Sequence, residues 1–209
     1  MVILYLETNF LMSLALNQDP GDSALLEKAA QDRSLRLAIP QVRFMEAFAT
    51  IRKRVEERAT FQRLIKTEIK QLERSKTSPV ARQLLDELNQ SSITNDEYTN
   101  RILDDFQQAT DRLAFLGEMF PFSRDSLKKS FAEPLIKSKR ERLVLPDNFI
   151  ICNIIENASV HPSEVKAFLS GYHRDFGTQV VRKALEAAGI EKYFAEARNF
   201  LGWYGSLPN

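Results

Sequence analysis

The start of the chain constrains its fold most, because an apolar run there ends at a carboxylate. Residues 2–6 are Val-Ile-Leu-Tyr-Leu, and Glu7 follows directly. An unbroken apolar run of this length predicts a strand buried on both faces, as in a parallel sheet. Residues 10–16 follow as a helix that Thr8 or Asn9 would cap through a side-chain oxygen. Ligands of open α/β sheets bind beyond the carboxyl ends of the strands, so we expect chemistry at Glu7.

Later apolar segments continue an alternation of strand and helix. We expect strands at residues 35–39 and 165–169, and a last short strand at 190–194 or at 199–204. A long amphipathic helix is predicted from Gln41 onward, after Pro40 closes the second strand. Strands that alternate with helices predict an α/β fold with a central parallel sheet.

The middle of the chain has a different character. Residues 57–118 carry many charges and only amphipathic helical patterns. Ser78-Pro79 is typical of a helix start, and Thr94 with Glu97 forms a capping-box pattern that predicts a second start. A basic segment follows at 123–142. We therefore predict a single domain over residues 1–209 with a helical insertion at about 57–142.

Charge and cysteine content narrow the class of protein. The 209 residues have a formal net charge of +1, so any surface that binds nucleic acid must be local. A single cysteine, Cys152, excludes an internal disulfide framework and fits a reducing compartment. We read it as an inert buried thiol. After the first sixteen residues no apolar run approaches the length of a membrane span. We expect a soluble cytoplasmic protein with no membrane partner.

Four acids stand at or near predicted strand ends and helix starts: Glu7, Glu46, Asp147 and Asp175. In a parallel sheet these positions can converge on one edge. Two like charges about 4 Å apart cost on the order of 4 kcal/mol at an effective dielectric constant of about 20, so converging carboxylates need a cation or raised pKa values. Hard oxygen ligands without a Cys or His pair favour Mg²⁺ or Mn²⁺ over Zn²⁺. Such an ion can orient a phosphodiester and activate water.

Four short motifs carry a resemblance, in the order 5–11 (YLETNFL), 39–46 (IPQVRFME), 145–150 (LPDNFI) and 174–176 (RDF). In this order they resemble PIN-domain nucleases over residues 1–55 and 143–195. The resemblance implies a PIN-like three-layer fold, an Mg²⁺- or Mn²⁺-dependent acidic site and RNA as the substrate. It places the family's acids at Glu7, Glu46 and Asp147. The family includes toxins of toxin–antitoxin pairs, so the resemblance allows an antitoxin or other protein partner, and a homodimer stays open.

Two positions depart from the family pattern. The first acid is Glu7 where the family usually has Asp, which moves a bound metal by one methylene. His173 stands where the family has an acid two residues before the Asp-Phe pair. Either Asp175 substitutes for that acid or the site has three strong carboxylates. His173 is also a candidate for proton transfer.

Each candidate has a plainer structural interpretation. Glu7 fits a solvated strand end, Glu46 an intrahelical pair with a nearby Lys or Arg, and Asp147 a helix cap. The basic segment is either a phosphate-binding face or a solvated one; its candidate contacts are Lys128, Lys129, Lys137, Lys139, Arg140 and Arg142.

The leading functional prediction is a metal-dependent endoribonuclease that hydrolyses RNA phosphodiester bonds. The alternative is a PIN-like RNA-binding or protein-interaction module with weak or no catalysis, which the Glu7 and His173 departures motivate.

Overall fold

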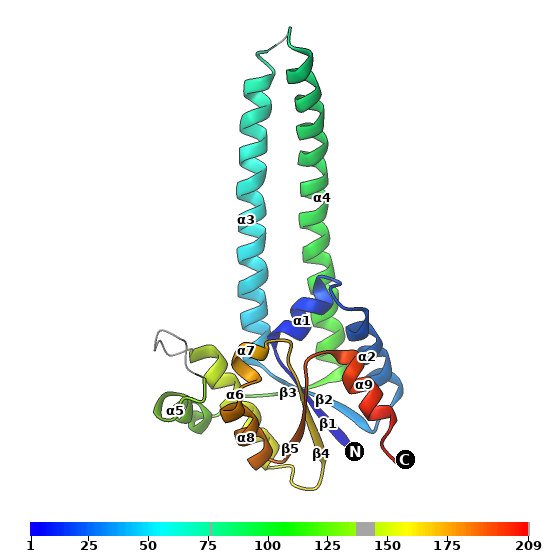
Figure 1. Cartoon of the computed structure of the whole chain (residues 1–209), viewed down its shortest axis with the longest axis vertical. Helices are drawn as coiled ribbons and strands as arrows, with labels where there is room; N and C mark the ends of the chain where they lie inside the picture. Colours follow the sequence, from blue (N-terminus) through cyan, green and yellow to red (C-terminus); the bar gives the residue numbers. More distant parts are fainter. Residues whose placement is uncertain (76, 137–144, 209) are drawn as a thin grey trace.

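A parallel sheet forms the centre of the computed structural model, which describes residues 1–75, 77–136 and 145–208 (Figure 1). Its five strands run in the order β3-β2-β1-β4-β5, and every neighbouring pair is parallel. The strands are β1 (Val2–Leu6), β2 (Leu35–Pro40), β3 (Gly117–Phe120), β4 (Val165–Leu169) and β5 (Ile190–Phe194). The predicted α/β class with a central parallel sheet is therefore confirmed.

Helices cover both faces of this sheet. Alternate side chains of β1 point to opposite faces, so the strand contributes to two cores. Leu4 and Leu6 pack into one apolar core, whereas Ile3 and Tyr5 pack into another. The first core lies against α1, α2, α3, α4 and α9, and the second lies mainly against α6 and α8. The helices are α1 (Thr8–Ala15), α2 (Pro20–Gln31), α3 (Val42–Leu72), α4 (Pro79–Leu116), α5 (Arg124–Ala132), α6 (Leu145–Ser159), α7 (His173–Phe176), α8 (Gln179–Ala187) and α9 (Ala197–Gly205).

Helices α3 and α4 form a long hairpin that extends away from the sheet (Figure 1). The 31 residues of α3 correspond to about 46 Å at a rise of 1.5 Å per residue. A buried polar pair joins the helices, with Asn95 Nδ2 donating to Gln62 Oε1 at 3.0 Å. A polar pair in an apolar seam favours one register of the two helices. None of the helices in the described ranges is long and apolar enough to cross a membrane.

The middle of the chain departs from its sequence prediction in two places. Strand β3 was not predicted, because of its four residues only Phe120 is buried and the strand lies at the sheet edge. Thr94 does not cap a helix; it lies inside α4, and its hydroxyl donates to the Gln90 carbonyl at 3.0 Å. The predicted start at Ser78-Pro79 is correct, since Ser78 caps α4 by accepting from Ala81 N at 3.2 Å.

The end of the chain resolves one open alternative. Residues 190–194 form the last strand, whereas 199–204 lie within α9. The α3–α4 hairpin spans residues 42–116 and overlaps the predicted helical insertion at about 57–142. The order of the strands reverses at β1, since β2 lies on one side of it and β4 on the other. Such a switch point is where ligands bind in open α/β sheets, so the carboxyl end of β1 is the place to look for a site.

Candidate active site

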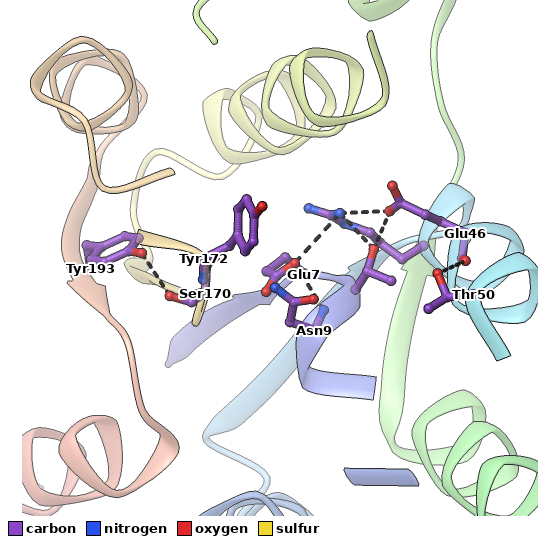
Figure 2. Close-up of polar contacts among 9 residues, drawn as sticks. Glu7, Asn9, Glu46, Thr50, Ser170, Tyr172 and Tyr193 are labelled. Carbon is purple, nitrogen blue, oxygen red and sulfur yellow. Dashed lines mark hydrogen bonds and ion pairs between the residues drawn. The ribbon is translucent and has the colours of Figure 1, made fainter. Parts of the chain in front are cut away.

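Glu7 occupies the switch point. It follows β1 directly, 4% of it is exposed, and its Oε2 accepts a hydrogen bond from Asn9 N at 3.0 Å (Figure 2). Glu7 is therefore the N-cap of α1, and the prediction that Thr8 or Asn9 caps this helix was wrong. Burial raises the pKa of Glu7, while Arg43 and the Asn9 N–H oppose that rise. A carboxylate with this exposure is not the solvated strand end of the plainer interpretation.

A buried cation lies among the acids, and it was not predicted. The side chain of Arg43 is 2% exposed, and its Nη1 donates to Thr8 Oγ1 at 2.7 Å and to Glu46 Oε2 at 3.1 Å. The same nitrogen lies 3.8 Å from Glu7 Oε2. The guanidinium also stacks on the Phe176 ring, 5.5 Å from its centroid. The site therefore contains its own counter-charge.

Arg43 and Thr8 hold Glu46 near the carboxyl end of β1, where Glu7 lies. The Thr8 hydroxyl donates to Glu46 Oε2, the same oxygen that Arg43 contacts. Glu46 and Arg43 are an i, i+3 pair within α3, so the predicted intrahelical partner exists. That pair lies beside Glu7, and Figure 2 shows Glu7 and Glu46 at opposite ends of the dashed contacts that link them. Glu46 can therefore pair with Arg43 and also belong to the candidate site.

Asp147 lies in the first turn of α6, and its pKa links it to the other acids. Burial raises the pKa of Asp147 to about 6, Arg43 opposes that rise, and the charges of Glu46, Asp175 and Glu7 add to it. The charges of the other three predicted acids thus act on the protonation of Asp147.

The α7 loop presents its two candidate residues differently. Asp175 is half-buried, whereas His173 is exposed at the start of α7, with its ring 6.0 Å from the Tyr193 ring. The charge of Asp175 acts on Asp147, and His173 is not among the causes of that shift. Of the two, Asp175 is the closer associate of the acids.

The donor set fits a hard divalent cation in its chemistry. Its carboxylate groups outnumber the Arg43 charge, and burial raises the pKa values of Glu7 and Asp147. The positions are a different matter: within the described part of the chain, no three Asp, Glu, His or Cys side chains come together closely enough to hold a metal ion. Glu7 and Glu46 converge on Arg43 instead.

The predicted basic surface is described only in part. Lys128 and Lys129 are exposed on α5, and Phe122 and Phe131 beside them are 56% and 55% exposed. Lys137, Lys139, Arg140 and Arg142 lie outside the described residues. The part of this surface that is described can reach solvent and therefore phosphate.

Sequence reasoning missed Arg43 although a signal was present. Arg43, Ala47 and Ile51 recur at intervals of four residues and are all buried, so an arginine shares the apolar stripe of α3. A charged residue on such a stripe requires buried partners. The sequence alone does not show that these partners are Thr8, from another element, and Glu46.

Comparison with known proteins identifies the family of the chain. No curated protein and no solved structure is significantly similar to the chain. A family model described as PIN domain matches residues 4–176, a range that includes all four acids and the α3–α4 hairpin. PIN domains are generally nucleases that act on nucleic acids and typically use divalent metals. Because the match covers most of the chain, this protein belongs to the PIN-domain family.

Proposed function

We propose that this protein is a divalent-metal-dependent endoribonuclease that hydrolyses RNA phosphodiester bonds. The observation that carries the proposal is the meeting of Glu7 and Glu46 at Arg43, beside the carboxyl end of β1, in a chain of the PIN-domain family. Burial raises the pKa values of Glu7 and Asp147, and buried acids with raised pKa values are typical of a functional site.

The proposed roles follow from what each side chain contacts. On this proposal Glu7, Asp147 and Asp175 would hold Mg²⁺ or Mn²⁺ once they move closer together, because no three acids of the described chain lie within reach of one ion. Glu46 already shares an oxygen with Arg43 and Thr8. When bound, the ion would neutralise phosphate charge and lower the pKa of an attacking water. Arg43 fixes Glu46 and Thr8 and reduces the repulsion between the acids. Exposed Lys128 and Lys129 would contact the phosphates of bound RNA.

A second candidate function is favoured by Arg43 itself. Because the guanidinium already compensates Glu7 and Glu46, the fold does not require a metal there. A PIN-like module that binds RNA or a protein without efficient cleavage is compatible with that arrangement. The two functions differ in turnover, not in binding.

Asp147→Asn tests the proposal. Asp147 is the third residue of α6 and not its N-cap, so the predicted cap role was wrong. Asn has nearly the same size as Asp, so the fold is expected to remain while cleavage falls by at least about 100-fold, as for loss of a group that acts in the transition state. Cleavage of a single-stranded RNA is measured in Mn²⁺, and RNA binding is measured separately in EDTA by fluorescence anisotropy. Asp125→Asn, an exposed first-turn acid of α5, is the matched control. Equal cleavage by parent and Asp147→Asn would refute the assignment, and tight binding without turnover by the parent would favour the second function.

A further inference from the structure

A cavity of about 290 Å³, lined in part by Glu7, lies between α1, α2, the ends of β4 and β5 and the start of α9. It opens at the switch point of the sheet, where α/β folds bind ligands. Four carboxylates line it, those of Glu7, Asp19, Asp22 and Glu196. Among the described residues that line it there is no Lys or Arg. The cavity therefore repels phosphate and attracts cations.

Asp22 distinguishes this cavity from an ordinary acidic surface. Only 5% of Asp22 is exposed, and its Oδ2 has no hydrogen-bond partner in the described structure. Burial raises its pKa to about 6, a hydrogen bond from Ser13 opposes that rise, and the neighbouring charge of Asp19 adds to it. Its place in the first turn of α2 favours a carboxylate, but it supplies no partner for Oδ2. A buried acceptor without a donor is costly unless a ligand supplies the donor.

The other three carboxylates of the cavity already have partners. Glu196 Oε2 is paired with Arg198 Nε at 2.6 Å. Asp19 Oδ1 caps α2 by accepting from Gly21 N at 2.8 Å. Glu7 Oε2 is engaged by Asn9 and Arg43, while its Oε1 has no hydrogen-bond partner among the described residues. The cavity carboxylate oxygens that are buried without a partner in the described structure are thus Asp22 Oδ2 and Glu7 Oε1.

The shape of the site selects the kind of cation. A bare metal ion does not fit, because no three acids of the described chain converge on one point. Apolar side chains from Phe10, Met12 and Leu169 line the same space. We propose that the cavity binds a small aliphatic polyamine or alkylguanidinium compound, with its methylenes on the apolar wall and its N–H donors on Asp22 and Asp19. This inference does not depend on the nuclease activity.

Calorimetric titration of the whole chain with agmatine, which joins a guanidinium and an ammonium group by four methylenes, tests the proposal. The parent is expected to bind one agmatine, and Asp22→Asn to weaken binding by at least about tenfold through loss of a charge-assisted hydrogen bond. Asp125→Asn, the exposed first-turn acid of α5, is the matched control and should bind as the parent does. Equal binding by parent and Asp22→Asn, or no binding by the parent, would overturn the proposal.

Two further measurements separate the remaining interpretations. Asp22→Asn removes a buried charge, so at pH 8 its urea midpoint should equal or exceed that of the parent; a variant that is folded and stable yet does not bind cannot be explained by misfolding. A Gly-Arg-Gly peptide that binds where agmatine does not would also overturn the small-molecule proposal and show that the guanidinium ligand belongs to a protein. Guanosine that binds while neither cation does would show a nucleobase pocket and overturn the inference.

Discussion

Replacing Arg43 by methionine tests whether a guanidinium serves as the internal counter-charge of the acidic site. Methionine fills a similar apolar volume but removes the hydrogen bonds to Thr8 (2.7 Å) and Glu46 (3.1 Å) and the charge 3.8 Å from Glu7. Breaking a buried ion pair by removing one partner costs about 3–5 kcal/mol, because the remaining charges stay buried. We expect the free energy of unfolding to fall by about that amount.

Urea denaturation followed by far-UV circular dichroism measures the loss, and Arg58→Met is the matched control. Arg58 lies on the same helix and stacks on Tyr98 at 5.1 Å, but it has no ion-pair partner among the described residues. Its replacement should cost about 1 kcal/mol or less, the value of an exposed cation–π contact. The difference between the two losses in unfolding free energy therefore separates the contribution of the Arg43 charge from the contributions of ring stacking and of the aliphatic part of the side chain.

The same variant reports on metal binding. Without Arg43 the acids carry more uncompensated charge, so Mn²⁺ should bind more tightly and stabilise the variant more than the parent. At an Mn²⁺ concentration equal to the parent's Kd, the parent gains about 0.4 kcal/mol, whereas a tenfold tighter variant gains about 1.4 kcal/mol. A loss below about 1 kcal/mol, or an Mn²⁺ effect equal in both proteins, would refute the role given to Arg43.

Three further predictions address the remaining groups. The pKa of Asp22 is raised to about 6 from 3.8, so the folded state holds its proton longer, and stability should fall as the pH rises from about 4 to about 6. Asp22→Asn should flatten a urea stability profile over that range, by at most about 3 kcal/mol and by less where water reaches the cavity. Asp175→Asn should raise the Mg²⁺ concentration for half-maximal RNA cleavage by about tenfold or more, while His173→Asp changes it less than about twofold; the reverse order would make His173 the fourth position of the site. Changing Lys128 and Lys129 to Gln should reduce the slope of log affinity for RNA against log salt by about 1–2, and an unchanged slope would show that α5 is merely solvated.

The sequence was sufficient where a signal is local. The buried strand β1 is an apolar run, and an acid follows it at the carboxyl end of the sheet, where open α/β sheets bind ligands. The order of the acid-containing motifs was enough to suggest the family that the match over residues 4–176 shows. These features depend on the pattern of apolar residues and on the order of the motifs, and both can be read from a single sequence.

The sequence was insufficient where a property depends on contacts between distant elements. Strand β3 was hidden because an edge strand with one buried residue lacks an apolar pattern. Arg43 was hidden because its partner Thr8 comes from the start of α1. Asp22 was not recognised as a candidate, because the cavity around it is completed by residues near position 196. In each case the decisive neighbour is far away in the chain.

Glu7 connects the acidic site and the cavity, and this has an energetic consequence. Its carboxylate lies 3.8 Å from the Arg43 guanidinium and also lines the cavity that contains Asp22. A cation in the cavity and a metal among the acids would therefore share one anionic neighbour and repel each other across it. Because coupling between two binding equilibria is reciprocal, each cation would weaken the affinity for the other by the same factor. On the two proposals above, an aliphatic polyamine would raise the metal concentration that the nuclease requires, and Glu7 would transmit the effect without a change in fold.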